Sequence, residues 1–423
     1  MNDRPGSMMR DVVSAYAASG ARVLSWVLIS ALVYRRMGLE ALALLALIRL
    51  TLAILNYTTL GLPTAIVALS SREPGSGRLT STAHLLGGAS ALLGAAVVAG
   101  YCVLFGRIHG PHNWPESGAL IASILGAGMI LRLASDVPGS LLQARGHIAI
   151  DNWIVAAGEL MWPALAWMPV FHTDTLNMVG AMYLGAMAWL LAARFLTALL
   201  MGRRDPAPAS SPAGPTARHL LAHGLTITAS QLADYLYAPA QSLLIERLIG
   251  PSMVGVYWPA VQIDAALLLL VSGLSAVLLP KAAIAASAGD RATLRRYFVR
   301  GTLASAGILL AAALVVWAIS PWLFRAWFGS DMPATRAILP LVLIHSVVGG
   351  AGGVGRSIML GMGLARAYTL AALAAGVGNV LLGCVLVKYA GLGLAGIVLA
   401  TIVVVVARCG LWMPWYILRR LPR

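Results

Sequence analysis

The sequence predicts an all-α polytopic membrane protein with about twelve transmembrane helices in two six-helix lobes around a central cavity. Of its 423 residues, 59% are hydrophobic and only 11% are charged, whereas a soluble domain carries roughly 25% charged residues. Apolar runs long enough to cross a bilayer recur along the whole chain. One stretch rich in Pro, Ala and Ser divides these runs into two sets of six.

Each expected span is an apolar run of about 20 residues, which is the length that a helix needs to cross the hydrocarbon core. The first run has no small-residue cleavage site after a short apolar core, so we expect a retained helix rather than a signal peptide. The expected spans are 12–34, 41–69, 81–105, 117–140, 152–171, 176–200, 220–246, 253–279, 301–324, 337–361, 367–387 and 393–417.

The stretch RRDPAPASSPAGPTAR (203–218) has too few large apolar residues to build a core. We therefore expect a flexible cytoplasmic linker between an N-terminal lobe, 1–202, and a C-terminal lobe, 219–423. Six spans per lobe leave the two lobes parallel, related by an axis along the membrane normal.

The two lobes also share a glycine spacing. Gly38 and Gly61 are as far apart in the N-terminal lobe as Gly250 and Gly273 are in the C-terminal lobe. In the register that superposes these pairs, Arg22 lies opposite Asp234.

The net charge of +15 comes almost entirely from arginine. Most of the cations lie in short segments that face the cytoplasm if both termini are cytoplasmic, as the positive-inside rule favours. We therefore expect anionic membrane lipids, and no nucleic acid, as partners of the charged surface. The three cysteines form no paired motif, and the histidines of RIHGPHNWPE have no third ligand nearby, so we expect no metal and no cofactor.

Three stretches carry a resemblance to a known family. The second-span region is YRRMGLEALALLALIRLTLAILNYTTLGLPTAIVALSSRE, and the eighth-span region, LIGPSMVGVYWPAVQIDAALLLLVSGLSAVLLPKAAIAASAGDRATLRRYF, carries Pro280 and a Gly-Asp at 289–290 before a basic helix. The third stretch, MLGMGLARAY (359–368), is similar to the short turn between the tenth and eleventh helices of the same family. Together they resemble the polysaccharide and oligosaccharide flippases of the multidrug/oligosaccharidyl-lipid/polysaccharide exporter superfamily.

This resemblance implies a flippase rather than an enzyme. Its substrate would be an anionic polyprenyl-(di)phosphate-linked oligosaccharide, moved by alternating access from the cytoplasmic to the outer face of a bacterial inner membrane. The resemblance implies a role in cell-surface polysaccharide biosynthesis, such as that of lipopolysaccharide or exopolysaccharide, beside polymerase and glycosyltransferase machinery.

Two other function classes stay open. A multidrug/cation antiporter of the same superfamily would need carboxylates that no cation opposes. A membrane glycan polymerase or ligase would need a larger outer loop with catalytic groups.

Arginines inside the spans are the candidate substrate ligands, because a charge at bilayer depth costs roughly 2.5–3.5 kcal/mol and the planar guanidinium suits phosphate. Arg22 shares a helical face with Ser14, Ala18 and Ser25. This face either lines a wet cavity or packs against a neighbouring helix, with Arg22 tied to a carboxylate. Arg49 and Arg356 are the other expected members of a cationic cavity, although Arg49 could instead reach the membrane interface.

Four acidic residues complete the candidates. Asp136 follows Arg132 by one helical turn, which predicts a structural ion pair between them. Asp234, Asp264 and Glu159 are expected to be either counter-ions or protonatable coupling groups. In the simplest interpretation, Asp234 neutralises Arg22.

Overall fold

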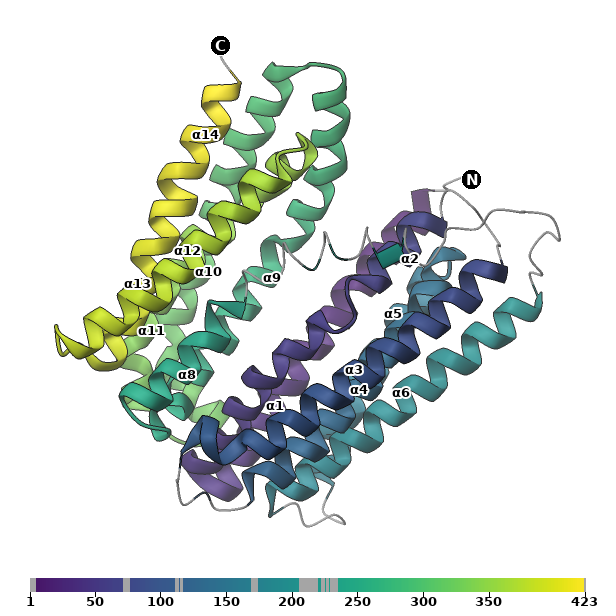
Figure 1. Ribbon diagram of the computed structural model, residues 1–423. Helices are drawn as coiled ribbons and strands as arrows, with labels where there is room; N and C mark the ends of the chain where they lie inside the picture. Colours follow the sequence, from purple (N-terminus) through teal and green to yellow (C-terminus); the bar gives the residue numbers. More distant parts are fainter. Residues whose placement is uncertain are drawn as a thin grey trace. The chain divides into compact units, whose positions relative to one another are not determined.

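The computed structural model describes residues 5–70, 77–110, 114, 117–168, 174–204, 220–221, 225, 228 and 235–421. Regular structure in these ranges is helical, which confirms the predicted all-α class (Figure 1). The chain divides into two compact units, Met1–Gln231 and Leu232–Arg423, here called the N-terminal and C-terminal units. Residues 205–218 of the predicted linker lie outside the described residues.

The N-terminal unit begins with a long helix that covers the first expected span and half of the second. This helix, α1, changes direction at Gly38, whose φ of +87° is not helical. A second break at Leu60 and Gly61 (φ +49° and +64°) separates a short 3₁₀ turn from α2. The described elements are α1 (Pro5–Leu52), η1 (Ala53–Tyr57), α2 (Leu62–Ser70), α3 (Gly77–His109), α4 (Gly118–Ala144), α5 (Ile148–Trp167) and α6 (Leu176–Arg204).

The C-terminal unit ends with a helix that contains a π-helical stretch, Val406–Trp412. Asp290 caps α10, since its carboxylate accepts a hydrogen bond from the backbone N–H of Thr293 at 2.9 Å. The described elements are α8 (Ala238–Leu248), α9 (Ser252–Ser287), α10 (Arg291–Phe328), α11 (Pro333–Gly361), α12 (Ala365–Lys388), α13 (Gly393–Val405) and α14 (Met413–Arg420).

Among the described residues, nine helices are long and apolar enough to cross a membrane. The first of these, Met9–Val67, contains two of the expected spans. The expected fifth span corresponds to α5, which is 20 residues long and buries Asp151 and Glu159. The expected seventh span is described mainly as α8.

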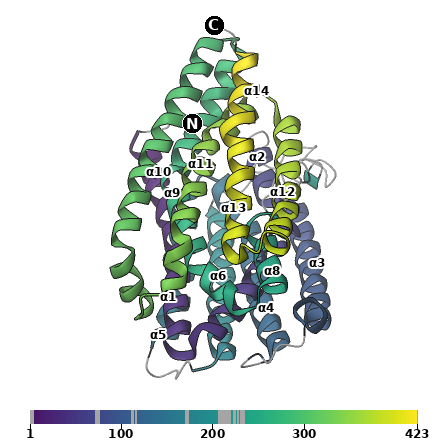
Figure 2. The ribbon, with the colours of Figure 1, turned by 90° about the vertical axis from the view of Figure 1, so that its left-hand side faces the viewer.

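In each unit one helix packs against nearly all the others. α4 contacts α1, α2, α3, α5 and α6, and α11 contacts α9, α10, α12, α13 and α14. Figure 2 shows α9, α10 and α11 side by side. Small residues allow a helix to take this central position, because they let neighbouring backbones approach closely.

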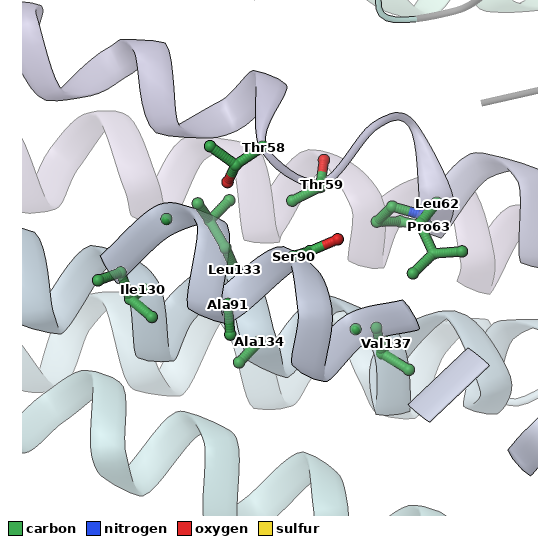
Figure 3. Close-up of a pocket in the computed structure, with 12 residues that line it drawn as sticks. Thr58, Thr59, Leu62, Pro63, Ser90, Ala91, Ile130, Leu133, Ala134 and Val137 are labelled. Atoms are coloured by element: carbon green, nitrogen blue, oxygen red, sulfur yellow. The ribbon is translucent and has the colours of Figure 1, made fainter. Parts of the chain in front are cut away.

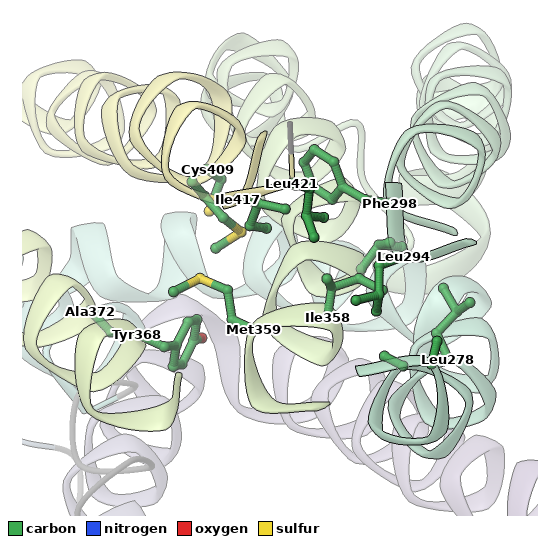
Figure 4. Close-up of a cluster of buried hydrophobic side chains, with 14 of the residues drawn as sticks. Leu278, Leu294, Phe298, Ile358, Met359, Tyr368, Ala372, Cys409, Ile417 and Leu421 are labelled. Atoms are coloured by element: carbon green, nitrogen blue, oxygen red, sulfur yellow. The ribbon is translucent and has the colours of Figure 1, made fainter. Parts of the chain in front are cut away.

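The glycines of α11 make room for the last helix. A Cβ on Gly352 would lie 2.7 Å from Cys409 Sγ, and one on Gly355 would lie 2.1 Å from Met413 Sδ. The side chains around this contact form the buried cluster of Figure 4, in which Met359 and Ile358 face Cys409 and Ile417. The glycine run of α11 therefore serves close helix packing.

The predicted repeat of glycines holds at one of its two positions. Gly38 and Gly250 both have positive φ and both lie at a break between successive helices. Gly61 also lies at a break, whereas Gly273 is inside α9. The two units therefore share their first helix break, and the second belongs to the N-terminal unit.

Adding a methyl group at Gly361 should destabilise the C-terminal unit. A Cβ there would lie 2.7 Å from Ala282 Cβ and 2.9 Å from the backbone nitrogen of Ala283, neither of which can rotate away. We expect Gly361→Ala to lower the free energy of unfolding by about 1–3 kcal/mol, measured as a lower unfolding temperature of the purified protein. Gly378→Ala is the control, because its Cβ meets nothing within 4 Å. Equal unfolding temperatures for the two variants would contradict this packing.

Candidate functional site

A buried carboxylate in the N-terminal unit holds two arginines from two other helices. The Nε atoms of Arg22 on α1 and Arg132 on α4 lie 3.0 and 3.2 Å from the same oxygen, Oε1 of Glu159 on α5. The side chain of Glu159 is 2% exposed and that of Arg132 is 16% exposed, whereas 45% of the Arg22 side chain is exposed. One carboxylate thus forms ion pairs with two guanidinium groups. Of these two arginines, Arg22 has the more exposed side chain.

Aromatic rings hold a third arginine in the same unit. The guanidinium carbon of Arg49 lies 3.5 Å from the ring centroid of Trp26, a cation–π contact that strengthens where water is excluded. Trp26 packs edge-on against Trp162, and Trp162 lies against Tyr183, each at 4.7 Å between ring centroids. Arg22 and Trp26 are one helical turn apart on α1, so these rings border the cluster of arginines.

A second ionic network in the N-terminal unit contains more carboxylates than arginines. Arg194 on α6 donates to both oxygens of Asp151 on α5, at 2.8 and 3.0 Å, and to Asp136 on α4 at 2.8 Å. Ser135 and Gln143 complete the network by hydrogen bonding to Arg194 and Asp151. Gly139 lets the guanidinium lie on α4, because a Cβ there would be 2.6 Å from Arg194 Cζ.

The balance of charges differs between the Arg194 network, which has a structural role, and the arginines around Glu159, which are candidate substrate ligands. The Arg194 network places two carboxylates around one arginine, and both Arg194 and Asp151 are buried. Arg22, Arg49 and Arg132 are here called the arginine cluster, and within it Arg22 and Arg132 share one carboxylate, that of Glu159. Two guanidinium groups around one carboxylate leave a local excess of one positive charge at Glu159. Arg22 is the exposed member of this pair of arginines.

The predicted pair of Arg132 with Asp136 is wrong. Arg132 pairs with Glu159 and Asp136 with Arg194, both across helices. Residues one turn apart can pair, but here a buried partner on a neighbouring helix takes each group. Asp234, the expected counter-ion of Arg22, lies outside the described residues, and Glu159 is the carboxylate that Arg22 contacts.

The small residues that share a face with Arg22 are buried. Ser14 and Ser25 are 0% exposed and Ala18 is 6% exposed. Asn152 on α5 donates a hydrogen bond to Ser14 Oγ at 3.0 Å. This face of α1 therefore packs against α5, which is the second of the two interpretations that the sequence left open.

The remaining candidates belong to the C-terminal unit. Asp264 on α9 accepts a hydrogen bond from Ser346 on α11 at 2.5 Å, and His345 Nε2 lies 3.7 Å away. Arg356 places its guanidinium carbon 5.6 Å from the centroid of the Tyr368 ring. Arg356 thus lies against the α12 side of the unit and does not line the cavity that contains Asp264.

Three important residues had no place among the sequence candidates. Asp151 lies in the first turn of α5, where charges are ordinarily solvated, so no pattern indicated its burial. Arg194 lies inside α6 and within an expected span, which made it an intramembrane charge like the other candidates. Arg408 was visible as a lone cation in VVVVARCGLW, within the last expected span. An intramembrane charge is a functional candidate by default, and this signal applied to Arg408 as well.

A small pocket beside α2 does not extend the site. It lies at the break after η1, where Thr58, Thr59 and Leu62 face Ser90 and Val137 (Figure 3). Its volume is about 10 Å³, which is close to the space of one water molecule. The pocket is therefore too small for a substrate.

Comparisons with known proteins bear on the family and the fold. A model of the family described as "Polysaccharide biosynthesis protein" matches residues 176–334. A search of the curated proteins with the sequence gives no match.

Two kinds of solved structure share the fold. One is an inward-facing multidrug resistance MATE family transporter of the MOP superfamily, with a TM-score of 0.76 and 18% identity over 96% of this chain and 94% of that one. Another is the lipid II flippase MurJ in an inward closed conformation, with a TM-score of 0.73 and 12% identity over 96% of this chain and 87% of that one. An outward-facing MATE transporter also matches, with a TM-score of 0.69 and 17% identity over 97% and 95% of the two chains.

These matches confirm the predicted fold class. The chain has the fold of these membrane transporters and of this flippase, and part of it matches a polysaccharide biosynthesis family.

Removing Arg194 should unfold the N-terminal unit more readily than removing Arg22. Arg194→Ala leaves the buried Asp151 without its cation, a change that costs about 3–5 kcal/mol. Arg22→Gln leaves Glu159 paired with Arg132 and changes a half-exposed side chain, so it should cost much less. Thermal unfolding of both purified variants measures the difference. A lower unfolding temperature for Arg22→Gln than for Arg194→Ala would contradict the structural role of Arg194.

Proposed function

We propose that the chain is a flippase that moves an anionic polyprenyl-(di)phosphate-linked oligosaccharide from the cytoplasmic to the outer face of a bacterial inner membrane. The observation that carries this proposal is the pair of Arg22 and Arg132, two guanidinium groups that share the single carboxylate of Glu159, with Arg22 exposed. Arginine suits phosphate, because its planar fork donates paired hydrogen bonds. The match to a polysaccharide biosynthesis family supports the saccharide as cargo.

Glu159 fits this mechanism as a counter-ion rather than as the coupling group. It holds the Nε edges of Arg22 and Arg132, so each guanidinium keeps further N–H donors for a substrate oxygen. With no substrate bound, Glu159 also limits the repulsion between the two cations. A phosphate that reaches Arg22 would meet fixed donors and would need little reorganisation of the site.

The membrane potential would favour export of such a substrate. Moving negative charge outward across an inside-negative membrane gains roughly 2.3 kcal/mol per charge at 100 mV. In alternating access one helical bundle rocks against the other around the binding site. The lipid tail would stay in the bilayer while the saccharide crosses, and polymerase and glycosyltransferase machinery would act before and after this step. We place both termini in the cytoplasm.

A multidrug/cation antiporter is the second candidate, because several structures of the same fold are named multidrug resistance transporters. A cationic drug would need carboxylates in excess. Around Glu159, two arginines instead share one carboxylate, a local excess of positive charge that favours the flippase.

Export in cells tests the proposal. In cells that lack the chain but keep their glycosyltransferases, lipid-linked oligosaccharide should accumulate on the cytoplasmic face, and the intact chain should relieve this accumulation. Arg22→Gln at equal abundance should lower export by about tenfold or more, because it removes a charged hydrogen-bond donor. Arg22→Lys should restore part of the rate, since it keeps the charge but not the fork.

Arg10→Gln is the matched control, because Arg10 lies on the same helix with an exposed side chain and only a 4.0 Å contact with Asp11. This variant should export normally. Normal export by Arg22→Gln, or sensitivity to cationic dyes without any accumulation of lipid-linked oligosaccharide, would contradict the flippase and favour the antiporter.

A further inference from the structure

The C-terminal unit contains a cavity of its own, with a volume of about 240 Å³. Its wall comes from α8, α9, α11, α13 and the π-helical stretch. The polar side chains on this wall are Tyr237, Gln241, Tyr257, Asp264, His345, Ser346, Thr401 and Arg408. A concave site with a few convergent polar groups is the usual form of a small-ligand pocket.

Most polar groups on this wall bond to one another. The Tyr257 hydroxyl donates to Gln241 Oε1 at 2.7 Å, and Gln241 Nε2 donates in turn to Thr401 Oγ1. Ser346 donates to Asp264. These pairs fix the shape of the cavity.

Arg408 is the exception. Its Nε and Nη1 atoms are buried, and neither has a hydrogen-bond acceptor within the described ranges. Asp264 lines the same cavity, but the ion pairs among described residues do not join it to Arg408. Buried donors are nearly always paired in folded proteins, and an unpaired buried cation is costly. Within the described residues, Arg408 is therefore a buried cation with donors that no acceptor occupies.

The local backbone directs Arg408 to this position. It lies within Val406–Trp412, where the last helix takes π-helical geometry. A π-bulge inserts a residue into a helical turn and often marks a functional site. Cys409, the next residue, packs on Gly352 of α11, and the Arg408 guanidinium carbon lies 5.2 Å from the centroid of the Tyr237 ring. The packed neighbour and the aromatic ring hold the guanidinium at the cavity.

A second nitrogen on the wall lacks a partner as well. His345 Nδ1 is buried and has no hydrogen-bond partner in the described part of the chain, while its Nε2 points to Asp264 at 3.7 Å. The cavity thus offers a guanidinium edge and an imidazole nitrogen to a ligand.

We propose that this cavity binds an anionic oxygen group, a carboxylate or a phosphate, with Arg408 as its main ligand. The guanidinium fork donates two parallel hydrogen bonds to such a group, and His345 donates a further one when Nδ1 carries a proton. A phosphate would come from a lipid headgroup and a carboxylate from an acidic sugar. The sugar source rests on the proposed function, but the anion site itself does not.

Binding to the purified full-length chain tests this site. The probes are glucuronate, inorganic phosphate and a short-chain polyprenyl phosphate, with glucose as the neutral comparison and the unfolding temperature as the readout. We expect at least one anion to stabilise the intact chain, and about tenfold or more weaker binding to Arg408→Gln. Arg291→Gln is the matched control, because Arg291 is exposed at the first turn of α10, and it should bind like the intact chain.

The pattern of probes identifies the source of the anion. Stabilisation by glucuronate alone assigns an acidic sugar, and stabilisation by phosphate and polyprenyl phosphate assigns a headgroup. Glucose binding as well as glucuronate, or anion binding that Arg408→Gln leaves unchanged, would overturn the proposal and leave a cavity filled by water.

A measurement on the unaltered protein covers the case in which Arg408→Gln does not fold. Phenylglyoxal modifies arginines, and mass spectrometry reports the modified fraction at Arg408 and at Arg291. A bound anion should protect Arg408 and not Arg291, whereas equal modification with and without anions would overturn the site. If the intact chain bound none of the anions but exported normally, this site would be overturned and the proposed flippase would stand. If the intact chain bound an anion through Arg408 but did not export lipid-linked oligosaccharide, the site would stand and the flippase would be overturned.

Discussion

The N-terminal unit depends on one constraint, which is that a charge buried among membrane-spanning helices needs an opposite charge on another helix. An isolated charge at bilayer depth costs several kcal/mol, and pairing offsets that cost only when the geometry is good. Glu159 therefore ties α1 and α4 to α5, while Arg194 ties α4 and α5 to α6. The helices that carry candidate substrate ligands are held by the same charges that give the site its excess of positive charge.

In both units, glycines on the central helix, α4 or α11, allow neighbouring groups to pack closely. Gly139 on α4 makes room for the Arg194 guanidinium, and Gly352 and Gly355 on α11 make room for the last helix of the chain. The consequences differ. In the N-terminal unit the glycine admits a charge that is fully paired, whereas in the C-terminal unit close packing of Cys409 holds the neighbouring Arg408 at a cavity.

Much of the fold could be predicted from the sequence, because hydrophobic run length and glycine-marked breaks depend on the chain alone. The arginines were found by their place inside apolar runs, and Glu159 by the same rule. Their partners were not. The pair of Arg132 with Asp136 failed because helical spacing identifies neighbours on one helix, whereas burial favours partners across helices. The position of the Arg408 side chain depends on a π-helical turn. No residue pattern in VVVVARCGLW predicts this turn.

Native mass spectrometry of the purified chain tests the central claim most directly, since it reports which lipids remain bound without relying on transport. Anionic polyprenyl-phosphate lipid should copurify with the intact protein, and most of it should be lost from Arg22→Gln while Arg10→Gln retains it. Equal retention by all three proteins, or binding of cationic compounds at the expense of anionic lipid, would contradict the claim that the arginine cluster receives the substrate.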